Sequence, residues 1–380
     1  MSQFAAKLPA LKPNPHWARL PLFNRKNWAP VRFGEVVENV NDTESDPGAA
    51  GLERFIGLEH LEPGSLHIRA WGNVADGTTF TRRCRPGQVL FGKRRAYQRK
   101  VAVAAFDAVV SGDIYVLAPK GDRLLPELLP FLCLSERFFQ HAVGTSAGSL
   151  SPRTNWSSLA SFEFDLPPLD QQRRIAEILW AVDETREAWK ETQSATLTAR
   201  ESHIAEFRQK SKTKVLCAEL VTLASGKAKP KDICEQANAE KSVPVYGGNG
   251  IIGYTAEPLL KETTIVVGRV GEYCGCVHFP DGESWITDNA IYIKEHDKRL
   301  KLPFLYWMLR AANLNKKKKI AGQPLISQST ITEEAIPLPS GKEQAEFLAS
   351  IDRFTGAFEA STNHCKTSSE LLGTLTNSFC

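Results

Sequence analysis

The stretch PPLDQQRRIAEIL at residues 167–179 is repeated in outline by PSGKEQAEFLASI at residues 339–351. Each stretch places a proline five positions ahead of a glutamine, Gln172 or Gln344, and each continues into a long segment with helical spacing of apolar residues. The two glutamines lie 172 residues apart. Recurrence at a fixed distance is the signature of an internal duplication, which decides the fold before any single motif does.

Three further pairs of segments recur in the same order and at nearly the same distance. They are GEVVENV (34–40) with AELVTLA (218–224), FGKRRAY (91–97) with VGRVGEY (267–273), and SGDIYV (111–116) with TDNAIYI (287–293). Each pair is a weak match alone, but their common order predicts two diverged copies of one plan.

Each copy begins with about 130 residues rich in Gly, Pro, β-branched and aromatic residues. The segments 101–110, 263–270 and 290–294 are typical of strands bounded by turns. The segments 127–142 and 302–315 predict matching short helices, with a proline near each start. The fold class expected is therefore α+β, with two α/β domains.

A helical tail follows each domain. The first tail meets no Pro or Gly from Leu169 to Gly226, which permits a helix of roughly 42 residues, about 63 Å long. Its apolar stripe comprises Ile175, Ile178, Leu179, Val182, Trp189, Ile204 and Phe207. The second tail has the stripe Phe347, Ile351, Phe354, Phe358, Cys365, Leu372, Leu375 and Phe379, in alternating steps of three and four.

A helix with one apolar stripe must bury it, and each tail offers the other a partner. We expect two antiparallel spacer helices forming a coiled coil, with the domains in a pseudo-twofold arrangement at its ends. The alternative is that each helix packs on its own domain. The predicted divisions are 1–168, 169–213, 214–340 and 341–380. Gln172 and Gln344 are expected to cap or brace the helix starts.

Composition narrows the class of protein. The chain has 380 residues, 42% apolar and 24% charged, which fits a soluble protein of more than one domain. No apolar run approaches the roughly 20 residues that span a bilayer, and the first residues lack a secretory signal. Eight scattered cysteines favour a reducing, cytoplasmic location. Since the net charge is only +4, any polyanion site must come from local clustering.

Three short motifs suggest chemistry that their surroundings do not support. GTSAG (144–148) resembles a nucleophile elbow at Ser146, but a helix precedes it and a loop follows. GNGIIG (248–253) resembles a dinucleotide loop, but β-branched residues follow it. Cys274, Cys276 and His278 fall on one face of a probable strand, where the outer two lie about 13 Å apart. No catalytic residue and no metal site are predicted.

Basic clustering remains, and it favours nucleic acid. The segment 81–100 carries eight cations and no acid, while Tyr and Gln residues lie among them. Lysine and arginine hold phosphates, and arginine, asparagine and glutamine read base edges. The DNA-binding candidates are Arg82, Arg83, Arg85, Lys93, Arg94, Arg95, Tyr97, Arg99 and Lys100 in the first copy. In the second copy they are Arg269, Tyr273, Lys316, Lys317, Lys318, Lys319 and Gln323.

These motifs together resemble one family. LPPLDQQRRIAEIL resembles the segment that ends each target-recognition domain in type I restriction–modification specificity subunits. VYGGNGIIGYT, TIVVGRVGEYCGCVHF and WITDNAIYI resemble one form of the recognition domain, and RPGQVLFGKRRAYQRKVAVAAF with VVSGDIYVL resembles another. The resemblance covers about residues 25–380. One departure is that LPSGKEQAEFL lacks the second proline of the first copy.

The resemblance implies a non-catalytic subunit that reads a bipartite, asymmetric double-stranded DNA target, one domain for each half-site. It also implies two methyltransferase subunits as partners, with restriction or translocase subunits as possible further ones. S-adenosylmethionine, ATP and Mg²⁺ would belong to those partners and not to this chain. A related methylation-only or type IIB-like defence system is the alternative. Two rival classes are a nuclease or methyltransferase, and a coiled-coil scaffold that does not touch DNA.

Overall fold

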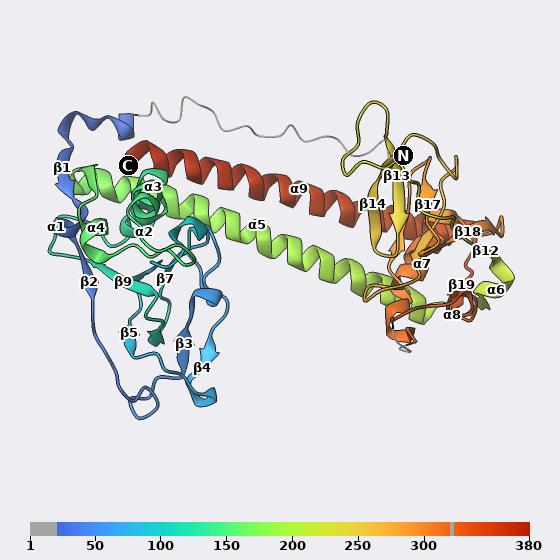
Figure 1. Cartoon of the computed structure of the whole chain (residues 1–380), viewed down its shortest axis with the longest axis horizontal. Coiled ribbons are helices and arrows are strands. Elements are labelled where there is room, and N and C mark those ends of the chain that lie inside the picture. The colour runs from blue at the N-terminus through green and yellow to red at the C-terminus, as the bar shows by residue number, and fades with distance from the viewer. Residues whose placement is uncertain (1–20, 320–322) are drawn as a thin grey trace. The chain divides into compact units, whose positions relative to one another are not determined.

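The computed structural model describes residues 21–319 and 323–380, and these form two compact units (Figure 1). One unit holds the described residues up to Lys190 together with Ser361–Cys380, and the other holds Glu191–Ala360. Each unit thus contains one α/β domain with a segment of each long helix, α5 (Leu169–Lys210) and α9 (Gly341–Phe379). The predicted α+β class with two long helices is confirmed.

The first domain contains ten strands and four short helices among its described residues. The strands are β1 (Ala29–Arg32), β2 (Val37–Val40), β3 (Arg54–Ile56), β4 (Gly72–Asn73), β5 (Arg82–Cys84), β6 (Val89–Gly92), β7 (Val101–Val103), β8 (Ala108–Val110), β9 (Ile114–Pro119) and β10 (Glu163–Leu166). The helices are α1 (Phe33–Val36), α2 (Leu129–Leu134), α3 (Glu136–Gly144) and α4 (Trp156–Ala160).

The second domain repeats that order. Its strands are β11 (Lys214–Leu216), β12 (Val221–Ser225), β13 (Val243–Gly247), β14 (Gly250–Thr255), β15 (Val266–Gly268), β16 (Val277–His278), β17 (Trp285–Ile286), β18 (Ala290–His296) and β19 (Ala335–Pro337). Its short helices are α6 (Cys217–Leu220), α7 (Leu302–Ala311) and α8 (Gln328–Thr332).

The sheets of the two domains correspond strand by strand. The first domain has the sheets β1-β10, β2-β9-β6-β7 and β4-β3-β8-β5. The second has β11-β19, β12-β18-β15-β16 and β14-β13-β17. In each three- or four-stranded mixed sheet one pair is parallel, β3 with β8 or β13 with β17. The counterpart of β5 is reduced to the single bridge between Leu260 and Ser284. The internal duplication therefore extends to the topology.

Several predicted elements are shorter than the sequence pattern indicated. The segment 101–110 forms two strands, β7 and β8, in different sheets. The segment 127–142 forms two helices, because Ser135 leaves the helical region (ψ 148°) and its hydroxyl accepts from the N–H of Phe138 to start α3. The segment 302–315 is helical only to Ala311 and then enters a 3₁₀ turn.

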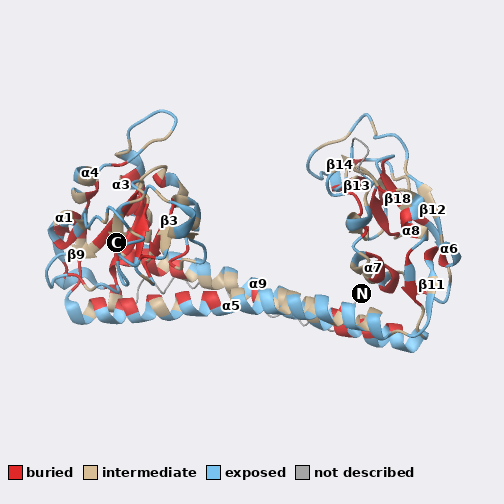
Figure 2. Cartoon of the chain, turned by 90° about the horizontal axis from the view of Figure 1, so that it is seen from below, coloured by how far each residue is buried: buried red, intermediate tan, exposed pale blue. Residues whose placement is uncertain are grey.

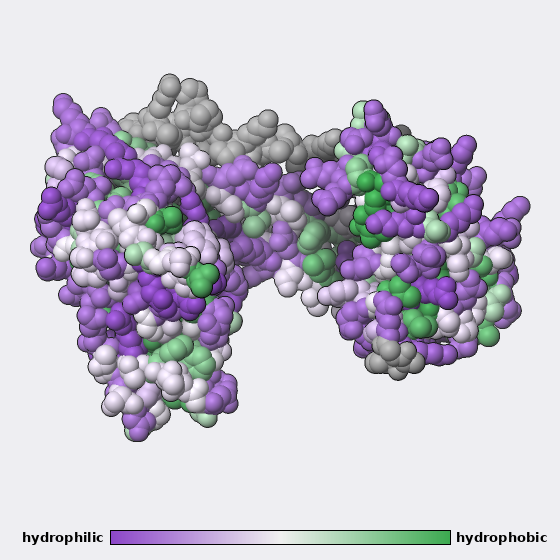
Figure 3. Space-filling view, viewed as in Figure 1, coloured by the Kyte–Doolittle hydropathy of each residue, from purple (hydrophilic) through white to green (hydrophobic). Residues whose placement is uncertain are grey.

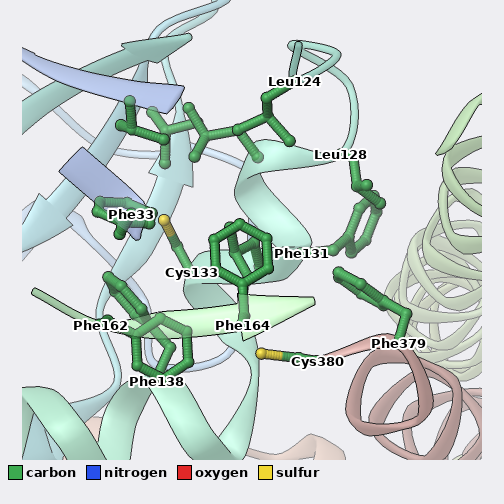
Figure 4. Packing of buried hydrophobic residues seen from close by; sticks show 14 of the residues in the cluster. Phe33, Leu124, Leu128, Phe131, Cys133, Phe138, Phe162, Phe164, Phe379 and Cys380 are labelled. Atoms are coloured by element: carbon green, nitrogen blue, oxygen red, sulfur yellow. The ribbon is translucent and has the colours of Figure 1, made fainter. Parts of the chain in front are cut away.

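The core of the first unit is one aromatic-rich cluster. Phe33, Phe131 and Phe138 are fully buried in it, and Phe379 and Cys380 at the end of α9 reach into the same cluster (Figure 4). Ile175, Leu179, Leu372 and Leu375 belong to this cluster too, so the first part of α5 and the last part of α9 share a core with the first domain.

The core of the second unit has the corresponding composition. Ile204, Phe347 and Ile351 are buried with Phe304 and Ile331 of the second domain. The ring of Phe347 lies 4.7 Å from that of Phe207 between centroids. In this unit the last part of α5 packs with the first part of α9, and in the other unit the first part of α5 packs with the last part of α9. The two helices therefore run antiparallel. Figure 2 shows buried residues recurring among exposed ones along both helices.

The remaining stripe residues lie between or beside these clusters. Val182 packs against the first cluster, and Phe354 is half-buried with its ring 5.7 Å from His203. Trp189 stacks on His364 at 4.4 Å, and Phe358 is half-buried.

Each long helix is braced at its start by a buried glutamine. The amide oxygen of Gln172 accepts from Leu125 N (2.9 Å), and its nitrogen donates to the carbonyls of Arg123 and Pro167 (both 2.8 Å). Gln344 has the same three kinds of partner: Lys301 N at 2.8 Å, Arg299 O at 2.8 Å and Pro339 O at 3.0 Å. Both glutamines are buried, which gives the recurring glutamine its structural reason.

Candidate nucleic-acid interface

The loops that follow β6 and β15 have the same hydrogen bonds. Gly92 N donates to Lys100 O and Gly268 N to Cys276 O, each at 2.9 Å. Lys93 N donates to Asp113 O as Arg269 N does to Asn289 O, again at 2.9 Å in both. We call residues 92–100 the first reading loop and residues 268–276 the second reading loop.

A second segment pairs with each reading loop. Thr154 N donates to Lys93 O (3.0 Å), and Ile326 N donates to Arg269 O (2.9 Å). Further along, Arg95 N donates to Pro152 O (2.7 Å) and Gly271 N to Pro324 O (2.9 Å). The candidate interface of each domain is therefore a pair of linked loops, and the linkage is made by backbone groups that any sequence supplies.

The reading loops also share an unusual backbone. Arg95 (φ 53°) and Arg99 (φ 54°) are left-handed in the first loop, and the equivalent positions in the second are Gly271 (φ 95°) and Gly275 (φ 87°). Such a conformation costs a non-glycine residue on the order of 1 kcal/mol or more. The first loop keeps this conformation with arginine, so the cations gained there come with backbone strain that the glycines avoid.

Each reading loop presents a tyrosine to solvent. Tyr97 is 56% exposed and Tyr273, its equivalent, is 62% exposed. Arg269 is exposed, whereas Lys93 at the same position is half-buried with its ammonium 4.9 Å from the centre of the Tyr115 ring. Burial and the charges of Arg82 and Arg153 lower the pKa of Lys93, against the opposing charge of Asp113.

Asp113 holds two arginines in the first domain. Its carboxylate accepts from Arg153 (2.8 Å) and Arg94 (3.4 Å), and the Ser151 hydroxyl accepts from Arg94 and Arg95 (3.1 and 3.3 Å). Burial would raise the pKa of Asp113, but the hydrogen bonds and charges of the two arginines outweigh it and lower that pKa. Arg94 is therefore already paired within the protein.

The end of the first reading loop is paired as well. Arg99 forms an ion pair with Glu136 and lies 5.2 Å from the centre of the Phe139 ring. Lys100 donates to the carbonyl of Leu58 at 2.6 Å. Among the predicted cations of this loop, these two have roles in packing the loop onto the domain.

The predicted cluster at 81–100 is divided between two sheets. Arg82, Arg83 and Arg85 lie on or just after β5, in the sheet that does not contain β6. Arg83 pairs with Asp107 at 2.9 Å and Arg85 with Asp42 at 2.8 Å. Arg82 donates to Asn39 Oδ1 (3.3 Å). Arg83 and Arg85 are therefore not brought into the reading loop, whereas Arg82 lies close enough for its charge to act on Lys93.

The lysine run of the second domain is also divided by its partners. Lys317 pairs with the buried Glu334, and Lys318 pairs with Glu272 at 2.7 Å. Lys316 and Lys319 are exposed, and Lys319 exchanges both backbone hydrogen bonds with Leu325 (2.9 and 3.1 Å). Gln323 is exposed at the start of that same paired segment.

A further basic segment was not predicted from the sequence. Lys227, Lys229 and Lys231 are exposed in GKAKPK (226–231), and Lys227 N donates to Ile286 O while its carbonyl accepts from Asp288 N. This places the segment beside Asn289, which holds the second reading loop. Three lysines within five positions were a visible signal, but charge runs are usually solvated faces.

The motifs set aside in the sequence have structural roles. The Ser146 hydroxyl follows α3 and donates to the carbonyl of Ala142 at 2.7 Å. Cys274 and Cys276 lie in the second reading loop, and the strand expected across them begins only at Val277. Burial lowers the pKa of His278 and raises that of Cys274.

One cluster of described side chains has the atoms to hold a metal ion. His67 Nε2 lies 2.6 Å from Asp183 Oδ2, and Glu187 completes a group whose ligand atoms lie within 4.8 Å of one another. Arg186 already donates to Asp183 (2.5 Å), and Lys190 to Glu187 (2.9 Å). Since these cations already neutralise the carboxylates, the cluster is better explained as an ion-pair network that ties the His67 segment to α5.

No helix among the described residues is long and apolar enough to cross a membrane.

The fold and the loops are those of a duplicated protein with a candidate nucleic-acid interface in each half. The chain is a tandem duplication in which each α/β domain presents a cation-bearing loop with an exposed tyrosine and ends in a long helix. A family model described as the type I restriction modification DNA specificity domain matches residues 79–199 and 211–366, one match in each copy. These matches cover well over half of the chain, which belongs to this family.

Two relatives from Escherichia coli are specificity subunits. The chain is 28% identical to the type I restriction enzyme EcoprrI specificity subunit over 123 residues, 32% of this chain and 30% of that protein. It is 24% identical to the type I restriction enzyme EcoDI specificity subunit over 229 residues, 57% of this chain and 49% of that protein. The chain thus spans half or less of the length of these two relatives.

The fold is similar to that of the type I restriction-modification system S subunit from M. genitalium. The TM-score is 0.60 with 14% sequence identity, covering 95% of this chain and 98% of that one.

Proposed function

We propose that this chain is the specificity subunit of a type I restriction–modification enzyme and reads a bipartite, asymmetric double-stranded DNA target, one half-site with each domain. The observation that carries the proposal is the pair of reading loops, which share their backbone and an exposed tyrosine but differ at most other side chains. The shared backbone conformation lets both domains approach DNA in the same way, while the side chains that differ select different bases.

The side chains divide into two tasks. Exposed cations such as Arg269, Lys316 and Lys227 bind phosphates, which supplies affinity without sequence preference. Tyr97 and Tyr273 project from the loops toward the bases. Candidate cations that pair with acids of the protein, such as Arg94 with Asp113 and Arg99 with Glu136, fix the first loop in place.

The two long helices act as spacers in this proposal. Half-sites read from one face of DNA require readers about 34 Å apart, one helical turn. Methyltransferase subunits dock on this chain, and restriction subunits complete the enzyme. S-adenosylmethionine, ATP and Mg²⁺ are bound by those partner subunits, and this chain is non-catalytic. The complex acts in the cytoplasm.

The test is selection of targets from a random duplex library by the purified full chain. We expect enriched sequences with two short half-sites separated by a fixed gap. Inserting four residues into α5 and four into the facing part of α9 adds about 6 Å to each helix. This variant should select the same half-sites with a changed gap. A single uninterrupted site, or no enrichment, would contradict the proposal.

A further inference from the structure

The hairpin of β13 and β14 has no role in the proposed function as stated above. Its tip carries the sequence GNGIIG (248–253), which forms the turn after β13 and the start of β14 instead of a dinucleotide-binding loop. Gly247 pairs with Gly250, so the turn consists of Gly248 and Asn249. Gly250 has a φ of 101°, which favours glycine at the exit of the turn.

Glycines let this turn lie directly on the second reading loop. A Cβ on Gly268 would overlap the carbonyl oxygen of Gly248, and one on Gly248 would come 2.6 Å from the carbonyl oxygen of Val270. The same Cβ would lie 3.4 Å from the carbonyl oxygen of Asn289, which anchors Arg269. Contact between backbones leaves little freedom, so the turn is held beside Arg269 in one position.

The outer side of the hairpin is unusually apolar for a surface. Ile251 is 49% and Ile252 42% exposed, and a bulge leaves Ile252 without a cross-strand partner. Bulges commonly redirect side chains near functional sites. In Figure 3 hydrophobic atoms lie over β13 and β14. Asn249 is exposed, and its side chain makes no hydrogen bond to residues 21–319 or 323–380.

Cations lie on the segments next to this uncharged tip. Arg269 lies in the segment that the tip contacts. The backbone of Lys227 is hydrogen-bonded to Ile286 and Asp288, just before Asn289, and Lys229 and Lys231 follow Lys227 in the sequence. Cations around amide and methyl groups match the surface of a DNA groove, where phosphates flank polar base edges and the methyl group of thymine.

We propose that the hairpin tip is a base-reading element for the second half-site, and that it recognises an A·T pair in the major groove. The Asn249 side chain accepts from adenine N6 and donates to N7, while Ile251 and Ile252 contact the methyl group of a thymine. The major groove is wide enough for a two-stranded ribbon. This inference rests on the proposed function, since it requires the second domain to bind DNA.

Within its described residues, 21–168, the first domain has no equivalent tip. There the position facing Gly92 is filled by a leucine side chain, since a Cβ on Gly92 would lie 3.0 Å from Leu58 Cδ2. Leu58 also offers its carbonyl to Lys100. The two domains therefore differ at this position, in keeping with half-sites of different sequence.

The experiment compares library selection by the full chain and by the variants Asn249→Ala and Ile251→Ala/Ile252→Ala. We expect both variants to retain the first half-site and the gap, and to lose preference at one or two A·T positions of the second. The affinity of Asn249→Ala for the wild-type target should fall by roughly 5- to 150-fold, since a bidentate pair contributes roughly 1–3 kcal/mol. The salt dependence of binding should not change, because no phosphate contact is removed.

Two controls separate the possible failures. Ile178→Ala removes an isoleucine of similar exposure (39%) from α5 and should leave the selected sequence intact. Lys227→Ala should weaken binding to all DNA sequences by the same factor. Variants that fold, by circular dichroism, and select the wild-type second half-site would overturn the inference alone. If the wild-type chain itself selects no bipartite target, the proposed function fails instead.

Discussion

At the scale of single residues, one buried glutamine amide in each domain connects that domain to the long helix that follows it. The side chains of Gln172 and Gln344 are buried, and each binds one N–H and two carbonyls of the backbone. The sequence predicted this bracing role, because a glutamine at a fixed distance from a proline recurs where each helix begins. The proline carbonyl lies five residues before each glutamine, but the other two partners of each were not predictable, since they come from loops more than forty residues away.

We expect Gln172→Leu and Gln344→Leu each to lower the free energy of unfolding by about 2–3 kcal/mol. Both replace an amide by an apolar group of similar size and leave three backbone groups unpaired. Chemical denaturation measures the change, and Arg174→Ala, on the exposed side of α5, should have an effect within about 0.5 kcal/mol. Equal effects of Gln172→Leu and Arg174→Ala would show that the brace does not stabilise the fold.

Asp113 is the second residue with a testable role. Its lowered pKa keeps the carboxylate ionised at neutral pH, paired with Arg94 and Arg153. Because the folded-state pKa lies below the usual value, the pairing stabilises the fold above about pH 4 and is lost as the pH falls through the folded-state pKa. The equivalent residue of the second domain is the neutral Asn289, so this restraint on arginine belongs to the first domain.

Asp113→Asn should therefore increase non-specific DNA binding at neutral pH. Releasing two arginines adds up to about two phosphate contacts. Each contact would steepen the slope of the logarithm of the binding constant against the logarithm of the salt concentration by about 0.9. Titration of a duplex without the target at several salt concentrations measures the slope. A slope equal to that of the wild type would mean that the arginines stay bound to other groups of the loop.

At the scale of elements, long patterns were predicted better than short ones. The start of α5 at Leu169 follows Pro167 and Pro168, and the absence of Pro and Gly up to Gly226 allowed its 42 residues without marking its end at Lys210. The division of 127–142 at Ser135 was not predicted, because serine, although it favours caps, also occurs inside helices and does not by itself mark a break. The left-handed arginines of the first reading loop had no signal at all, since only glycine reveals such a position in a sequence.

The helix α9 offers a prediction of its own. Gly356 and Gly373 are exposed in its interior, and a Cβ at either position meets no atom within 4 Å. Alanine restricts the unfolded chain more than glycine does, so Gly356→Ala and Gly373→Ala should each raise the free energy of unfolding by about 1 kcal/mol. Gly268→Ala should instead destabilise the chain, because its Cβ would overlap Gly248. Denaturant midpoints distinguish these outcomes.

At the scale of the whole molecule, the duplication assigns each end of α9 to a different core. Phe347 near its start is buried with Phe304 of the second domain, and Phe379 at its end is buried with Phe131 of the first. The sequence contained the repeat and the apolar stripe, but it could not show that the stripe joins the cores of both domains, because periodicity identifies a buried face without identifying what covers it.

Substituting these two phenylalanines should therefore loosen different domains, although both lie on one helix. Each change to alanine removes a buried ring and should cost about 3–5 kcal/mol. With hydrogen exchange read by mass spectrometry, Phe379→Ala should increase exchange in α2 and α3, and Phe347→Ala in α7 and α8. Because each ring contacts the core of its own unit, each substitution serves as the control for the other. Equal increases in both domains from either substitution would show that the chain unfolds as one cooperative unit, and the assignment of two separate cores to α9 would then be wrong.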